Sequence, residues 1–167
     1  MEMPKRKPIR LNGYDYSQNG AYFVTVCTKD RKPVLSCIVG DGFPVPQLTK
    51  KGKIVQAFIE KIPDKYPNVQ IDHSVIMPNH VHLIVHIQNH DGQSGTGNPS
   101  PTVGTVMGWW KYQTTKAIRE IDPCDDEKLW QRSYYDHVIR GEDDYRAIWQ
   151  YIDENPVKWH LDELYIR

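Results

Sequence analysis

The amino-acid sequence predicts a single domain of the α+β class, in which helices cover one face of an antiparallel β-sheet. The chain has 167 residues, which is the length of one ordinary domain. Its apolar periodicity changes along the chain in the order strand, helix, strand, strand, helix, strand, helix. Two of the strand-like segments are separated by only a short turn, which favours antiparallel pairing.

The first half of the chain contains a strand, a helix and a hairpin. Residues 21–28 (AYFVTVCT) are rich in aromatic and β-branched residues, which is typical of a strand. Residues 49–62 carry apolar side chains every three or four positions, which predicts an amphipathic helix. Residues 69–77 and 81–87 are two further predicted strands, and the proline and asparagine between them are typical of a turn.

The second half begins after a segment of linker composition. Residues 89–101 are rich in Gly, Ser, Asn and Pro and predict a flexible loop within the domain. Residues 103–121 have helical spacing and are followed by Pro123, which ends the helix. Residues 134–139 predict a short strand, and residues 143–154 a helix with acidic residues in its first turn.

Composition excludes several classes of protein. No stretch approaches the 18 or so apolar residues of a membrane helix, and the first ten residues lack the apolar part of a signal peptide, so we expect a cytoplasmic protein. The three cysteines include no C-x-x-C pair, which argues against a disulfide scaffold or a zinc ribbon. Lys plus Arg equals Asp plus Glu at 21 each, so any nucleic-acid site must be local.

Two histidines provide the densest chemical signal. His80 and His82 lie on a predicted strand, where alternate side chains share one face with Cβ atoms about 7 Å apart, close enough to share a metal ion. His86 faces the same side but lies roughly 13 Å further along the strand, too far to join that ion. The alternative is that both are ordinary hydrogen-bonded histidines near a strand end.

A second candidate site lies at the end of the last predicted helix. Tyr151 and Asn155 are four residues apart and therefore share one helical face. Pro156 disfavours the helical conformation at Asn155 and marks the helix end, where the amide is freer to turn toward a ligand. The chain has ten tyrosines, however, and Tyr151 would also suit a core position.

These motifs resemble those of a known family. His80-Val81-His82, introduced by Met77-Pro78-Asn79, resembles the signature of the HUH nucleases. Tyr151-x-x-x-Asn155-Pro156 resembles the nucleophile motif of one branch, the REP-associated tyrosine transposases, within the insertion-sequence-type single-tyrosine HUH transposases. The resemblance continues in segments 10–16, 22–25, 130–137 and 155–159. It implies a ferredoxin-like or RRM-like sheet with the HUH motif on a central strand.

The resemblance also implies a reaction and its residues. Tyr151 would cleave single-stranded DNA and form a 5′-phosphotyrosyl intermediate, which a 3′-hydroxyl later reverses. His80, His82 and Asn155 would bind Mg²⁺ or Mn²⁺, and mixed nitrogen and oxygen ligation suits these ions. The DNA would be a palindromic hairpin of the REP type, in a bacterial, nucleoid-associated setting, with a monomer favoured and a homodimer possible. Two alternatives are a non-catalytic hairpin-binding protein of the same fold and a metal-dependent hydrolase without a covalent intermediate.

Contacts to DNA are expected from two regions. The predicted N-terminal arm, residues 1–16, combines basic residues for phosphates with aromatic residues for stacking on bases. The helix 103–121 adds lysines beside Trp109 and Trp110, at least one of which we expect in the core. Residues 157–167 form a predicted C-terminal tail. The candidate DNA-binding residues are Lys5, Arg6, Lys7, Arg10, Tyr14, Tyr16, Lys111 and Lys116.

Overall fold

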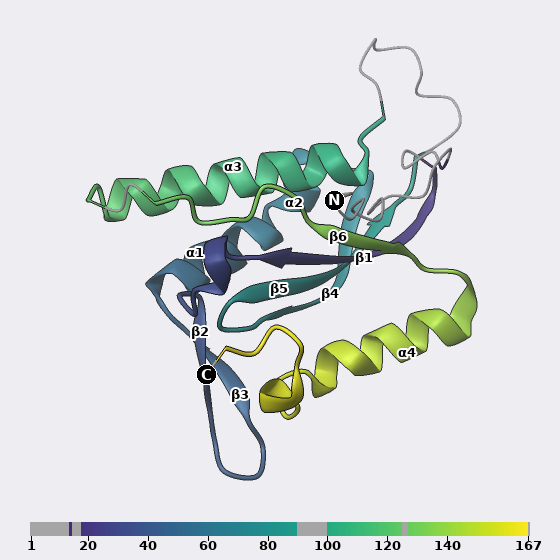
Figure 1. Cartoon of the computed structure of the whole chain (residues 1–167). Helices are drawn as coiled ribbons and strands as arrows, with labels where there is room; N and C mark the ends of the chain where they lie inside the picture. Colours follow the sequence, from purple (N-terminus) through teal and green to yellow (C-terminus); the bar gives the residue numbers. More distant parts are fainter. Residues whose placement is uncertain (1–13, 15–17, 90–99, 125–126, 167) are drawn as a thin grey trace, which may run out of the picture.

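The fold is built on a four-stranded antiparallel sheet (Figure 1). The computed structural model describes residues 14, 18–89, 100–124 and 127–166. The strands are β1 (Gly20–Cys27), β4 (Val69–Ile76), β5 (His80–Ile87) and β6 (Tyr135–Val138), in the order β4-β5-β1-β6. The α+β class is therefore confirmed, and the histidine motif lies on a central strand, as predicted.

One face of the sheet carries the main core. The helices α1 (Lys50–Glu60), α2 (Ile62–Lys65) and α3 (Val103–Ile121) pack there (Figure 1). Thr49 and Thr102 begin α1 and α3, and each side chain accepts a hydrogen bond from a backbone N–H of the first turn. Alternate side chains of the central strands β1 and β5 point into this core. Burial of their apolar surface therefore determines which side chains of these two strands lie on the other face of the sheet.

The opposite face is covered by α4 (Gly141–Glu154) (Figure 1). Phe23 and Ile84 are cross-strand partners on β1 and β5, and Ile152 of α4 packs against them. The prediction that all helices lie on one face is therefore wrong for α4. The physical reason is that β5 is buried almost along its whole length, so both of its faces need an apolar cover.

The predicted helices and strands agree closely with the observed ones. Their ends differ by two residues at most, and the helix predicted over residues 103–121 has those bounds. The prediction missed a hairpin of β2 (Ser36–Val39) and β3 (Val45–Leu48), whose turn includes Gly40 and Gly42 with positive φ. It also missed two short 3₁₀ helices, Lys29–Arg31 and Trp159–Leu161. Most of the loop predicted at 89–101 lies outside the described residues.

The chain after α4 turns back onto the sheet. The Asn79 side chain, at the turn before β5, donates a 2.7 Å hydrogen bond to the carbonyl oxygen of Leu164. The ring of Trp159 lies 5.7 Å from the ring of His80, measured between centroids, and 5.2 Å from that of Tyr165. The described part of the predicted tail is therefore packed at the start of β5. Among the described residues, no helix is long and apolar enough to cross a membrane.

Candidate active site

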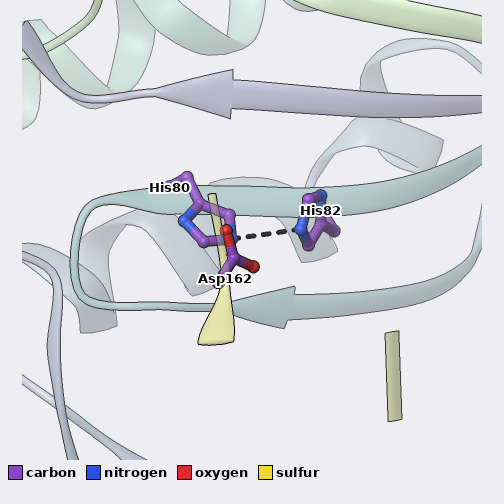
Figure 2. Close-up of side chains that lie close together, drawn as sticks. All are labelled: His80, His82 and Asp162. Atoms are coloured by element: carbon purple, nitrogen blue, oxygen red, sulfur yellow. Dashed lines mark hydrogen bonds between the residues drawn. The ribbon is translucent and has the colours of Figure 1, made fainter. Parts of the chain in front are cut away.

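The two histidines of β5 face the same side of the sheet, as the strand alternation predicted. The Nε2 atoms of His80 and His82 lie 3.1 Å apart (Figure 2). His80 is fully buried and His82 is 2% exposed. Their opposite ring nitrogens also have partners, because His80 Nδ1 lies 2.9 Å from Asn79 Oδ1 and His82 Nδ1 lies 2.8 Å from Thr25 Oγ1.

These contacts orient both rings. Asn79 Oδ1 can only accept, so His80 Nδ1 carries a proton and its Nε2 carries a lone pair. The Thr25 hydroxyl can donate or accept, so His82 can exchange its proton between its two nitrogens. When His82 Nδ1 donates to Thr25, both Nε2 lone pairs are available on the same side of the strand. Such outer hydrogen bonds are the usual support of histidine metal ligands.

Burial keeps both imidazoles neutral near pH 7. It lowers the pKa of His80 to about 4, although the Asp162 carboxylate and the Asn155 side chain act in the opposite direction. Burial and the neighbouring His80 hold the pKa of His82 well below its ordinary value. A neutral imidazole is the form that binds metals.

The end of α4 places Tyr151 and Asn155 beside the histidines. The ring of Tyr151 lies 5.3 Å from that of His82 and 6.0 Å from that of Phe23, and the residue is 46% exposed. Asn155 is buried, and its Nδ2 donates a 3.0 Å hydrogen bond to Asp162 Oδ2. Its Oδ1 is buried without a hydrogen-bond partner among the described residues. One helix therefore delivers a hydroxyl and an unsatisfied carbonyl oxygen to the same place.

Asp162 completes the group from the C-terminal segment. Figure 2 shows its carboxylate beside the two histidine rings. One nitrogen of each ring and one carboxylate oxygen of Asp162 lie within 4.8 Å of one another. These three residues come from two parts of the chain that are about eighty positions apart in the sequence.

The environment of Tyr151 favours its protonated form. Burial raises the pKa of the phenol, and the Asp162 carboxylate raises it further, while the Asn155 side chain lowers it. The hydroxyl is therefore protonated at neutral pH. It needs additional positive charge nearby, or a group that accepts its proton, to act as a nucleophile.

A pocket of about 720 Å³ opens beside these groups. Its volume falls within the range of ligand sites in proteins. Residues of β1, β5, α4 and the C-terminal segment line it, among them Phe23, Thr25, His82, Tyr151, Asn155 and Asp162.

Comparison with known proteins identifies the family. The model of the family described as "Transposase IS200 like" matches residues 16–155. The chain belongs to this family. An uncharacterized protein of Haemophilus influenzae is 35% identical to this chain over an alignment of 173 positions, which spans 96% of this chain and 93% of that protein.

Two further matches are to REP-associated tyrosine transposases. A REP-associated tyrosine transposase of Escherichia coli (strain K12) is 27% identical over 146 residues, which cover 86% of this chain and 70% of that protein. The solved structure of a REP-associated tyrosine transposase bound to a REP hairpin has a TM-score of 0.62 and 24% sequence identity. That match covers 92% of this chain and 76% of the other. The predicted relationship and the fold class are thereby confirmed.

The structure describes only some of the residues predicted to bind DNA. Lys5, Arg6, Lys7, Arg10 and Tyr16 lie outside the described residues.

Three predicted DNA-binding residues are described. Tyr14 packs against the main core, with its ring 6.4 Å from that of Tyr22. Lys111 donates from Nζ to the carbonyl oxygens of Gln131 and Arg132 at 2.5 and 3.1 Å, and burial lowers its pKa. Lys116 is exposed on α3. Of these three, Lys116 has the position most suited to a phosphate contact, whereas Lys111 joins α3 to the segment before β6.

The two tryptophans of α3 belong to the core or pack against it. Trp110 is fully buried against Trp130, at 4.9 Å between ring centroids. Trp109 lies 6.3 Å from Phe58 and 5.9 Å from Tyr66. The expectation that at least one tryptophan belongs to the core is confirmed.

Proposed function

We propose that this protein binds a palindromic single-stranded DNA hairpin of the REP type and cleaves and rejoins the adjacent strand. Tyr151 is the nucleophile, and the intermediate is a 5′-phosphotyrosine. The observation that carries the proposal is the position of Tyr151, whose ring lies 5.3 Å from that of His82 and which lines the pocket. A hydrolase that used the histidines alone would not need a half-exposed tyrosine beside them.

His80, His82 and Asn155 hold Mg²⁺ or Mn²⁺ in this proposal. The residues fit such an ion, because the imidazoles are neutral and Asn155 Oδ1 is a buried oxygen without a hydrogen-bond partner in the described chain. Nitrogen and neutral oxygen donors without a thiolate suit these ions better than they suit a structural zinc. When bound, the cation supplies positive charge that polarises a non-bridging phosphate oxygen.

The chemical step conserves the number of phosphoester bonds. The Tyr151 oxygen forms a bond to phosphorus while the bond between phosphorus and the 3′ oxygen breaks. The phenol proton passes to solvent, and the departing 3′ oxygen takes up a proton. The phosphotyrosine keeps an ester bond, so a 3′-hydroxyl can attack it and restore the DNA strand without an added energy source.

Asp162 opposes this step while the centre holds no cation, because its negative charge raises the pKa of Tyr151. Positive charge close to both groups would offset that effect. The raised pKa of Tyr151 therefore agrees with a reaction that depends on a divalent cation.

The choice of a hairpin as the substrate rests on the proteins that this chain resembles. The E. coli relative is a REP-associated tyrosine transposase, and a solved structure of similar fold holds a REP hairpin. We propose that Lys5, Arg6, Lys7 and Arg10 of the basic arm contact phosphates, with Tyr14 and Tyr16 of the same arm as the stacking residues. Lys116 on α3 is a further proposed phosphate contact, whereas the Nζ of Lys111 is held by two backbone carbonyl oxygens.

A covalent-trapping experiment tests the function. The protein is mixed with a hairpin that carries a single-stranded extension labelled at its 3′ end, because the tyrosine is joined to the 5′ phosphate of that fragment. We expect a labelled adduct that survives denaturation and that requires Mn²⁺ or Mg²⁺. Tyr151→Phe removes only the hydroxyl and should bind the hairpin within a few fold of the wild type without forming the adduct.

Tyr135→Phe is the matched control, since Tyr135 is also half-exposed and lines the pocket. It should form the adduct. An adduct from Tyr151→Phe would show that the nucleophile is another residue. Hairpin binding without any adduct, with the cation present, would instead identify a non-catalytic hairpin-binding protein.

A further inference from the structure

We propose that Asp162, in the segment after α4, is an anionic ligand of the divalent cation. This inference rests on the proposed function, because it concerns the same cation. It adds a ligand that lies outside the histidine and tyrosine motifs. The geometric basis is the approach of one Asp162 oxygen and one nitrogen of each histidine to within 4.8 Å of one another (Figure 2).

The carboxylate of Asp162 is held by hydrogen bonds from two neutral groups. The backbone N–H of Leu164 donates to Oδ1 at 2.7 Å, and Asn155 Nδ2 donates to Oδ2 at 3.0 Å. Both donors fix the direction of the carboxylate, and neither brings a compensating charge. A cation between Asp162 and the two imidazoles would supply that charge.

The charge of the ligand set supports the same assignment. His80, His82 and Asn155 are neutral donors, and all three are at least 97% buried. A doubly charged ion in such a place retains its whole charge in a poorly solvated environment, which is costly. The Asp162 carboxylate reduces the net charge of the centre, and carboxylate oxygens are preferred ligands of Mg²⁺ and Mn²⁺.

Asn155 has two roles in this arrangement. Its amide nitrogen orients Asp162, while its Oδ1, on the same side chain, is buried without a hydrogen-bond partner among the described residues. One amide can thus direct a carboxylate and present its own oxygen to the same ion.

The surrounding segment is anchored where Asp162 requires it. Asn79, which also orients His80, donates to the carbonyl oxygen of Leu164. Trp159 precedes Asp162 in the sequence, and its ring packs near that of His80. The Asn79 side chain therefore helps to position both His80 and the segment that carries Asp162.

Direct measurement of cation binding tests the proposal. Mn²⁺ is titrated into the whole chain without DNA, and bound ion is followed by calorimetry or by electron paramagnetic resonance. We expect Asp162→Asn to weaken Mn²⁺ binding at least tenfold, as loss of supporting groups alone does at metal sites. Glu163→Gln makes the same change of charge at the adjacent, exposed residue and should stay within twofold of the wild type.

A ligand exchange covers the case in which Asp162→Asn fails to fold. Asp162→Cys would place a thiolate in the centre and should bind Cd²⁺ at least tenfold more tightly than Asp162→Ser, because thiolates favour soft ions. The serine variant keeps the native cysteines, including Cys27 in the same pocket, and therefore shows how much Cd²⁺ they bind without the introduced thiolate.

The outcomes separate this inference from the proposed function. Unchanged Mn²⁺ affinity in Asp162→Asn, together with loss of binding in His82→Ala, would overturn the role of Asp162 and leave the histidine site intact. Wild-type Mn²⁺ affinity in His82→Ala would overturn the cation site itself. Equal Cd²⁺ affinity of the cysteine and serine variants would also count against Asp162.

Discussion

Burial of His80 makes the stability of the metal-free protein depend on pH. The pKa of His80 is about 4 in the folded chain, against an ordinary value of about 6.5 when unfolded. Between these values the unfolded chain binds more protons, so the free energy of unfolding falls as the pH falls below 6.5. The direction for His82 is the same.

We therefore predict that the protein without metal loses about 2 kcal/mol of stability from His80 alone between pH 7 and pH 5. Urea unfolding in the presence of a chelator measures this change. His80→Gln keeps a polar side chain without a group that titrates in this range, and its stability should change less with pH. Equal pH dependence of the two proteins would contradict the prediction.

The residues that the sequence could predict are those whose spacing translates directly into geometry. His80 and His82 alternate on one strand, and Tyr151 and Asn155 lie one helical turn apart, so local periodicity places each pair on a common face. Asp162 has no such signal, because its position depends on the reversal of the chain after α4. Thr25 is similar, since its contact with His82 depends on the register of β1 against β5.

At the scale of elements, α4 is held on the sheet by a small apolar contact and several polar ones. Ile152 is 1% exposed and packs with Phe23 and Ile84. His73 on β4 stacks on Trp149 at 4.2 Å and contacts Asp153 at 2.7 Å. The sequence predicted α4 but not the face that it covers, because apolar residues occur on both faces of β5 and do not specify which helix covers which face.

Ile152→Ala should therefore destabilise the protein by about 2 to 5 kcal/mol, because it leaves a cavity under the helix that carries Tyr151. Urea unfolding measures the loss. Ile121→Ala makes the same change at the end of α3, where the side chain is 55% exposed, and should alter the stability by less than about 0.5 kcal/mol. Similar losses for both variants would mean that α4 does not depend on this contact.

At the scale of the whole molecule, one chain supplies every group of the candidate site. His82 comes from β5, Tyr151 from α4 and Asp162 from the C-terminal segment of the same chain. We predict that the protein acts as a monomer, the state favoured from the family resemblance.

Mixing two inactive variants tests this view. We predict that His82→Ala and Tyr151→Phe form no adduct separately or together, because no chain then contains both groups. A dimer that shares its sites between subunits would recover part of the activity in the mixture. Recovery of the adduct would therefore contradict the prediction of a monomer. As a control, each variant is mixed with wild-type protein to show that neither variant inhibits adduct formation.

The return of the C-terminal segment to the start of β5 also bears on modularity. The family match ends at residue 155, whereas contacts to Asn79 and Asn155 come from residues beyond it. A protein shortened to the matched region would keep the recognisable motifs but lose the Asp162 acceptor of the buried Asn155 amide and the shorter of the two hydrogen bonds that the Asn79 amide donates. Buried donors without acceptors are costly. The unit recognised by sequence comparison is therefore smaller than the unit that must be transferred intact in a chimaera or a domain fusion.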